Sequence, residues 1–462
     1  MRFALFYHSI RSDWNHGHAH FLRGTVRALL SLGHAAVCYE EAGNWSVTNL
    51  VAEHGLQPLV EFRRRFPFAE TRLYHREPHE ALERRLCAEL AGVDVVLIHE
   101  WTAIENPALV DLLARLKRAF GFLLFFHDSH YRVLTQPVRM ARLGLGRFDA
   151  ILAYGPAIAD EYRRRLGLGQ VHVFHEAADT ALFRPQPADP RRPMDDALFI
   201  GNWGGRDRAH ELREFLLRPA RRFRAARRFA IYGVRYPPPI AQTIQRHYGV
   251  EYRGWLPNYL VPRAFAQTRV AVHVVRRQYT QVLHGTPTIR VFEALACGAA
   301  LVSTPWRDTD GLFRAGQDYL VVDSRAQMME ALEWLWRDPA ARERLGKSGA
   351  ARVRAQHTCR HRARQLLALV ARLNGGEPAA DLQRVHRAPV TGTGVRLGTN
   401  GHAGVARSAF GGLGSSLRVT SSELGGGDSA APSAEPATPR RRPRPRAAYA
   451  VPAPVPSRLG RM

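Results

Sequence analysis

The feature that most constrains the fold is a repeated alternation of short apolar runs with amphipathic stretches. In the first part of the chain, the apolar runs predict strands at Phe3–Tyr7, Ala35–Tyr39, Val93–His99, Phe122–Phe126 and Ala150–Ala153. The stretches between them predict helices at His20–Leu32, Pro78–Leu90, Pro107–Arg118 and Ala157–Leu166. Strands that are apolar on both faces and joined by helices form parallel sheets, so this part predicts an α/β domain.

A second alternation follows the proline-rich, charged segment RPQPADPRRP, whose composition is typical of a linker. Its predicted strands are Ala197–Gly201, Phe229–Gly233, Glu251–Gly254, Val270–Val275, Ala299–Ser303 and Tyr319–Val322. Its predicted helices are Arg208–Phe215, Pro239–His247, Leu260–Ala266, Arg290–Ala296 and Ala326–Arg337, closed by helical stretches at Pro339–Gln356 and Arg360–Leu373. The sequence therefore predicts an α/β fold with two Rossmann-like doubly wound domains.

These patterns divide the chain into five segments. We expect an N-terminal domain over residues 1–183, a linker over 184–194, a second domain over 195–355, a closing helix over 356–374 and a tail over 375–462. The tail is rich in Gly, Ser, Pro and Arg and cannot bury enough apolar surface to offset its ordering entropy, so we predict that it is disordered and basic. Its arginine cluster, RRRPRPR, could contact an acidic partner or an anionic membrane surface, or simply be solvated.

Charge and cysteine content narrow the functional classes. The formal net charge of +25 would attract nucleic acid, anionic lipid or anionic substrates such as sugar nucleotides. Nearly all the basic residues are arginine, with Lys117 and Lys347 the only lysines, which a codon bias would also produce. No nucleic-acid-binding signature is found, so no specific nucleic acid is expected as a partner. The four scattered cysteines and the lack of an apolar run of about 20 residues predict a cytoplasmic protein, at most peripheral to the membrane.

The stretch GTPTIRVFEALACGAALVSTP, residues 285–305, reads as one ligand-binding unit. Thr286 to Thr288 predict a loop and helix entrance, Arg290 to Ala296 a short helix carrying Glu293, and Ala299 to Thr304 a buried strand. A helix start presents free backbone N–H groups to an anion, and a nearby carboxylate can accept hydrogen bonds from a ribose diol. This combination suits a sugar nucleotide, although an ordinary helix–strand unit fits the local pattern as well.

Further segments place glycine or polar residues directly after a predicted strand, where open α/β sheets bind ligands. Asn15-His16-Gly17-His18 follows the first strand, and FLLFFHDSHYR places His127 and Asp128 at the end of another. In the second half, LFIGNWGGRDR places Gly201, Arg206 and Arg208 in the same situation. Two other segments are HVFHEAADTALFRP, residues 172–185, and YRGWLPNYLVPRAF, residues 252–265.

These motifs, in this order on two tandem domains, resemble a GT-B glycosyltransferase over about Arg2 to Leu373. Within that fold, the chain is similar to the group 1 and GT4-like enzymes, particularly the spore-maturation CgeB-like branch. Many GT4 relatives carry two glutamates eight positions apart. Glu293 matches the second, whereas position 285 holds glycine; CgeB-like proteins show Thr-x-Arg-Val-Phe-Glu, which here is Thr288 to Glu293.

The resemblance implies a site in the interdomain cleft. His127 would lie beside the transferred sugar, with His130 as a weaker candidate, and Arg206 would neutralise the leaving pyrophosphate, with Arg208 as its alternate. His127 and Arg206 are the expected catalytic residues. Segment 172–185 would form the interdomain hinge. The residues expected to bind the donor are Gly17, Gly201, Arg208, Trp255, Thr288, Arg290 and, on the ribose, Glu293. Trp255 fits a core position equally well.

No metal is expected, because Asp308-Thr309-Asp310 falls in a loop after a strand and GT-B enzymes generally need none. No cofactor is expected either, apart from the nucleotide-diphosphate sugar that serves as donor substrate.

The sequence therefore predicts transfer of a sugar from a nucleotide-diphosphate donor to an acceptor hydroxyl of a glycan, lipid or protein. One alternative is a catalytically degenerate GT-B protein that binds a nucleotide sugar or a partner without turnover, because position 285 lacks the expected carboxylate. Another, a sugar-nucleotide epimerase or hydrolase, would need carboxylate and histidine pairs that the sequence does not place. The donor sugar, the base and the stereochemical course stay open.

Overall fold

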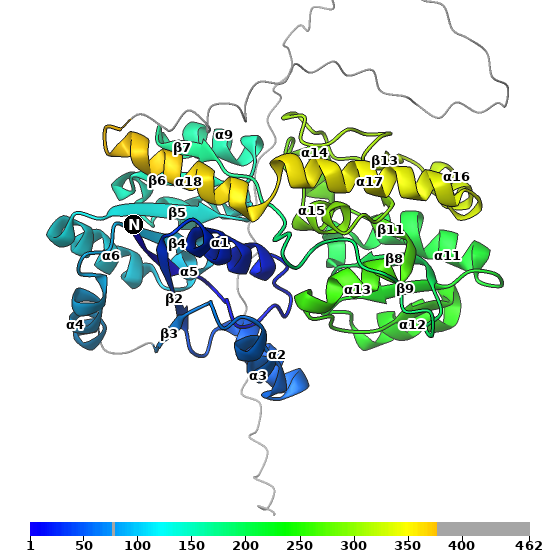
Figure 1. The fold of residues 1–462 in the computed structure, drawn as a ribbon, viewed down its shortest axis with the longest axis horizontal. Coiled ribbons are helices and arrows are strands. Elements are labelled where there is room, and N and C mark those ends of the chain that lie inside the picture. Colours follow the sequence, from blue (N-terminus) through cyan, green and yellow to red (C-terminus); the bar gives the residue numbers. More distant parts are fainter. Residues whose placement is uncertain (76–78, 377–462) are drawn as a thin grey trace, which may run out of the picture. The chain divides into compact units, whose positions relative to one another are not determined.

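The computed structural model describes residues 1–75 and 79–376, which form two α/β domains, each built on its own sheet (Figure 1). The predicted disordered tail lies outside the described residues from position 377 onward. The first sheet contains β1 (Arg2–Phe6), β2 (Ala35–Glu41), β3 (Thr71–Tyr74), β4 (Val95–His99), β5 (Leu123–Asp128), β6 (Ala150–Ala153) and β7 (Val171–Val173). All neighbouring strands pair in parallel, in the order β3-β2-β1-β4-β5-β6-β7.

Helices connect these strands, as the alternation predicts. They are α1 (Ala19–Ser31), α2 (Trp45–His54), α3 (Gln57–Arg65), α4 (His79–Leu90), α5 (Glu100–Glu105), α6 (Pro107–Phe120), α7 (Arg132–Thr135), α8 (Pro137–Ala141) and α9 (Pro156–Leu166). Strands β4 and β6 are buried along their whole length, which is why their sequences are continuous apolar runs.

The second sheet repeats the same plan with six parallel strands in the order β10-β9-β8-β11-β12-β13. These are β8 (Asp195–Ile200), β9 (Phe229–Tyr232), β10 (Val250–Tyr252), β11 (Thr268–His273), β12 (Leu301–Ser303) and β13 (Leu320–Val321). Its helices are α10 (Ala209–Leu212), α11 (Arg218–Phe223), α12 (Pro238–Tyr248), α13 (Val261–Ala266), α14 (Arg277–Gln281), α15 (Ile289–Ala296), α16 (Arg325–Arg337) and α17 (Pro339–Gln356). The chain reverses direction across each sheet at β1 and β8, which is the doubly wound arrangement.

The last helix, α18 (Cys359–Leu373), returns to the first domain. Arg362 Nε donates to the carbonyl of His175 at 2.8 Å, and Gln365 Nε2 donates to the carbonyl of Val173 at 2.8 Å. Helix α18 packs so closely on α1 that a side chain at Gly24 would collide with Cys359 Sγ. The sequence predicts α18 as a closing helix after the second domain, and in the structure it lies along the first domain (Figure 1).

One apolar cluster joins the two domains. It includes Phe3 of β1 and Phe21 of α1 and extends through Phe183 to Val291 of α15 and Leu366 of α18. None of the helices in the described ranges, 1–75 and 79–376, is both long and apolar enough to cross a membrane.

Candidate functional site

A cavity of about 390 Å³ opens at the carboxyl ends of both sheets. From the first domain, its wall is formed by residues 13 and 15–18 between β1 and α1, residues 99–101 after β4, residues 129–132 after β5, and Glu176. From the second domain come the ends of β8, β9 and β11 and the start of α15. The motifs that follow strands in the sequence therefore converge on one space, where doubly wound sheets bind their ligands.

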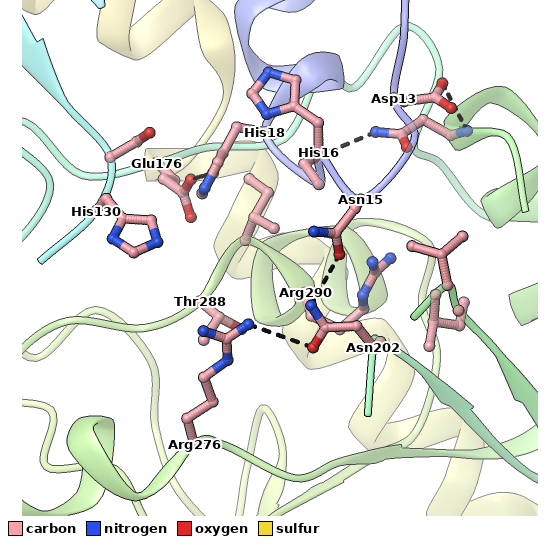
Figure 2. A pocket seen from close by; sticks show the side chains of 18 of the residues that line it. Asp13, Asn15, His16, His18, His130, Glu176, Asn202, Arg276, Thr288 and Arg290 are labelled. Atoms are coloured by element: carbon pink, nitrogen blue, oxygen red, sulfur yellow. Dashed lines mark hydrogen bonds and ion pairs between the residues drawn. The ribbon is translucent and has the colours of Figure 1, made fainter. Parts of the chain in front are cut away.

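The loop between β1 and α1 connects the two domains across this cavity. Asp13 accepts hydrogen bonds from Trp255 Nε1 at 3.2 Å and from the backbone N–H of Asn258 at 3.1 Å. Asn202 Nδ2 donates to Asn15 Oδ1 at 2.9 Å, which places an amide pair at the centre of the cavity wall (Figure 2). Asn15 holds a left-handed backbone with φ of 47°, a conformation that asparagine tolerates better than most residues.

Arginine is the dominant charge in the cavity wall. Arg208 donates to both the carbonyl and the side-chain oxygen of Asn202, and Arg276 donates to Asn202 Oδ1 at 3.3 Å and to the Tyr131 hydroxyl at 3.2 Å. Burial, and then the neighbouring Arg276, lower the pKa of Arg208 to about 10, so it stays cationic at neutral pH. The arginines that line the cavity are Arg132, Arg208, Arg235, Arg276 and Arg290.

The start of α15 faces the same cavity. Thr288 occupies the position before the helix, and its side chain makes no capping hydrogen bond. Its carbonyl accepts from the N–H of Val291 at 3.1 Å, so the N–H groups of Ile289 and Arg290 are the first-turn donors offered to an anion. Its hydroxyl instead pairs with His273 Nε2 at 2.8 Å, while His273 Nδ1 pairs with Ser303 Oγ at 2.9 Å. Burial, with help from nearby arginines, lowers the pKa of His273 to about 3, so a neutral imidazole positions Thr288.

Neutral histidines line the opposite side of the cavity, in the first domain. Burial lowers the pKa of His18 to about 4 and holds the pKa values of His16, His99 and His130 well below their usual range. His18 Nδ1 contacts the carboxylate of Glu176 (Figure 2). His16 Nε2, His99 Nδ1 and His130 Nδ1 have no hydrogen-bond partner among the described residues. This wall therefore offers several polar atoms to an uncharged, hydrogen-bonding group.

The structure places six of the nine predicted site residues in this wall: Gly17, Gly201, Arg208, Trp255, Thr288 and Arg290. Arg206 lies outside the wall, exposed on the short turn Gly205–Asp207. Arg208, two positions later, occupies the place beside the cavity. His127 and Glu293 are buried behind the wall rather than in it.

His127 lies at the end of β5, as its motif predicts, but its ring faces aromatic neighbours. It is 2% exposed, with ring centroids 5.6 Å from both His99 and Phe174 and 5.9 Å from Phe21. Burial lowers its pKa to about 3. His130, three residues further along the same motif, is the histidine of that motif that reaches the cavity.

Glu293 is fully buried, with no exposed surface. Its carboxylate lies 2.9 Å from Nδ1 of His20 on α1 and also contacts Arg290 one turn earlier on α15. In this conformation, Glu293 therefore links the two domains and orients a cavity arginine instead of facing the open space.

Sequence reasoning included Asn15 and Asn202 in motifs without assigning either a role, and it missed Arg276. Asn202 and Arg276 each follow a buried strand within three residues, which is the same signal that selected Gly201 and Arg208. No local pattern predicts that Asn15 pairs with Asn202, because the two residues lie 187 positions apart and meet only when the domains pack.

Contacts within the fold account for Gly285 and for the Asp308–Asp310 segment. Gly285 has a φ of 73°, and a side chain there would collide with Thr309 and Pro156. Asp310 Oδ2 pairs with His175 Nε2 at 2.8 Å. Within the described part of the chain, no group of three or more His, Cys, Asp or Glu residues is arranged to hold a metal ion.

Comparison with known proteins agrees with this geometry. Residues 208–368 match the family model described as glycosyl transferase-like, a span that contains Arg208, Arg276 and the start of α15. Sucrose-phosphate synthase from Thermosynechococcus elongatus superposes with a TM-score of 0.56 at 17% identity, covering 81% of this chain and 99% of that one. The fold is GT-B.

Two other solved structures share this GT-B fold. HepE from Anabaena, in complex with UDP and glucose, has a TM-score of 0.56 at 11% identity, covering 79% of this chain and 98% of its own. An alpha-glucosyltransferase in complex with UDP and a 13-mer DNA has a TM-score of 0.57 at 12% identity, covering 80% and 99%. No curated protein matches this sequence.

Proposed function

We propose that this protein is a glycosyltransferase that moves a sugar from a nucleotide-diphosphate donor to an acceptor hydroxyl in the cavity. The observation that carries the proposal is the convergence of Arg208, Arg276 and the uncapped start of α15 at the carboxyl end of the second sheet. A diphosphate is the ligand that such a combination of guanidinium groups and free backbone N–H groups suits best. The family match over residues 208–368 supports the same assignment.

The proposed reaction needs charge stabilisation more than acid–base chemistry. When the bond between the sugar and the diphosphate breaks, negative charge grows on the leaving oxygen, and fixed cations lower the energy of that state. We assign this role to Arg208 and Arg276, with Thr288 positioned by the neutral His273. The sugar would lie toward the first domain, where His18, paired with Glu176, offers a hydrogen-bonding surface.

The remaining predicted residues take indirect roles in this proposal. The ring of His127 packs against the ring of His99, which lines the cavity. Arg206 is exposed on the turn Gly205–Asp207, outside the cavity wall. Glu293 holds Arg290 in place; a direct contact with ribose would require it to exchange its pairing with His20.

Finer features of the proposal rest on motifs and on what neighbours bind. We place the chain in the CgeB-like branch on its Thr288-Ile289-Arg290-Val291-Phe292-Glu293 sequence. We propose a metal-independent, cytoplasmic enzyme with peripheral contact to anionic membrane surfaces. Because HepE is known with UDP and with UDP-glucose, UDP is the first nucleotide to test.

Calorimetric titration with UDP and a UDP-glucose hydrolysis assay test this proposal. We expect Arg276→Gln to weaken UDP binding by about ten- to a hundredfold, because a charge-assisted hydrogen bond contributes roughly 1.5–3 kcal/mol. The matched control is Arg337→Gln, an exposed arginine on α16 that pairs with Glu333 and lies outside the cavity wall. UDP binding that is equal in both variants would contradict the assigned site, and nucleotide binding without turnover on any donor would favour the degenerate alternative.

A further inference from the structure

A second cavity, of about 310 Å³, lies entirely within the first domain and has no role in the function proposed above. It is built at the carboxyl ends of β1, β2 and β3, from the start of α2 and from the length of α5. Its lining residues are His8, Glu41, Gly43, Asn44, Trp45, Thr48, Tyr74, Thr102 and Glu105. Its volume is at the lower end of the roughly 300–1,000 Å³ typical of small-molecule sites, which favours a single ring over a lipid chain.

Aromatic rings separate this smaller cavity from the larger one. Trp101 lines the larger cavity and stacks on His8 at 4.4 Å and on Trp45 at 5.6 Å between ring centroids, while both partners line the smaller cavity. The guanidinium of Arg235, also in the wall of the larger cavity, lies 5.8 Å from the Trp45 ring centroid. The two cavities are therefore neighbours across a single layer of side chains.

Two buried polar groups in the smaller cavity lack partners. His8 Nε2 and Thr102 Oγ1 make no hydrogen bond to the described residues, although each side chain is about 95% enclosed. Burial, and then Arg132, lower the pKa of His8 to about 3, so its imidazole is neutral. A buried hydroxyl and imidazole left unpaired cost free energy, and a ligand carrying hydroxyl groups would satisfy both.

The charge of the smaller cavity is opposite to that of the larger one. Among its lining residues, the carboxylates Glu41 and Glu105 are the only charged groups, and Arg139 lies 3.6 Å from Glu105 at the exposed rim. An anionic ligand would be repelled here, whereas a neutral or amine-bearing ligand would not. The larger cavity therefore favours an anionic diphosphate, whereas the smaller cavity favours an uncharged or amine-bearing group.

We propose that the smaller cavity binds a neutral or amine-bearing sugar ring, as a carbohydrate site separate from the donor cavity. The exposed indole of Trp45 packs against the C–H face of the ring, and Thr102 and His8 bond its hydroxyl groups.

The test is saturation-transfer NMR on the full chain with four matched probes: glucose, glucosamine, glucuronic acid and glucose 6-phosphate. We expect glucose and glucosamine to bind and the two acidic sugars not to bind. Trp45→Ala should weaken glucose binding by about tenfold or more, and Thr102→Val, which keeps the side-chain shape, should weaken it by about fivefold. The matched control is Trp334→Ala, an exposed tryptophan on α16 of the second domain, which should bind glucose like the wild type.

Three results would overturn the inference: no binding of glucose or glucosamine, equal binding of the acidic sugars, or wild-type binding in both the Trp45 and Thr102 variants. UDP titration of the same samples separates this inference from the proposed function. A wild-type chain that binds glucose but no nucleotide diphosphate refutes the donor site. Intact UDP binding with any of the three overturning results refutes only the sugar site in the smaller cavity.

Discussion

Replacing Glu293 by glutamine tests whether this carboxylate holds the two domains together. The side chain is fully buried and contacts both His20 of the first domain and Arg290 of the second. Removing one member of a buried ionic group leaves the others uncompensated, which costs about 3–5 kcal/mol. We therefore expect Glu293→Gln to lower the melting temperature by roughly 4–6 °C, measured calorimetrically without ligand.

A second variant distinguishes this explanation from a general packing defect. Replacing His20, Glu293 and Arg290 together by leucine removes the whole buried ionic group, and such replacements are often neutral in stability. We expect this triple variant to recover most of the lost melting temperature while UDP binding stays weakened, because the cavity then lacks Arg290. The control is Glu333→Gln on the exposed face of α16. A melting temperature for Glu293→Gln within about 1 °C of the control would refute the reasoning, since the penalty of an uncompensated buried pair would then be absent.

Three further predictions follow from backbone geometry and burial. Gly285→Glu should destabilise the fold by more than about 2 kcal/mol, because φ is positive and Thr309 is in the way, and should not increase transfer; a stable, more active variant would contradict this. Gly24→Val should lower the melting temperature by separating α1 from α18, and an unchanged value would show that this contact is loose. Burial lowers the pKa values of His18 and His273 to about 4 and 3, so the unfolded chain binds more protons below pH 6.5. Urea denaturation should therefore show full stability above pH 6.5 and a loss of about 1.4 kcal/mol per pH unit per histidine as the pH falls toward 4; equal stability at pH 7 and pH 5 would contradict this.

Most of the fold could be predicted because its central strands are buried on both faces. Ala150–Ala153 was predicted with the bounds that the structure gives, since a continuous apolar run can only be an interior strand. Strands Thr71–Tyr74 and Val171–Val173 were missed, because they are short edge strands with mostly half-buried side chains and carry little periodicity. Helix α18 was predicted as a closing helix, but its packing on α1 was not, since an apolar face does not specify its partner.

The candidate site was predictable only in part, for a related reason. A motif at the end of a strand marks the edge of the sheet, but it does not tell which following side chain turns toward the cavity. Hence the sequence favoured His127 and Arg206, while the structure brings His130 and Arg208 to the wall. Burial of Glu293 depends on His20, 273 positions earlier in the chain, and no local pattern contains that information.

The return of the chain to the first domain at α18 limits how the domains can move. The polypeptide crosses between them twice, and the crossings are hydrogen-bonded to each other, with Ala178 N–H donating to the carbonyl of His357 at 3.0 Å and Cys359 N–H donating to the carbonyl of Ala178 at 2.9 Å. Two crossings held together by backbone hydrogen bonds restrict relative motion of the domains to rotation about the axis through these crossings. After such a rotation, the same arginines of the second domain would face the same histidines of the first.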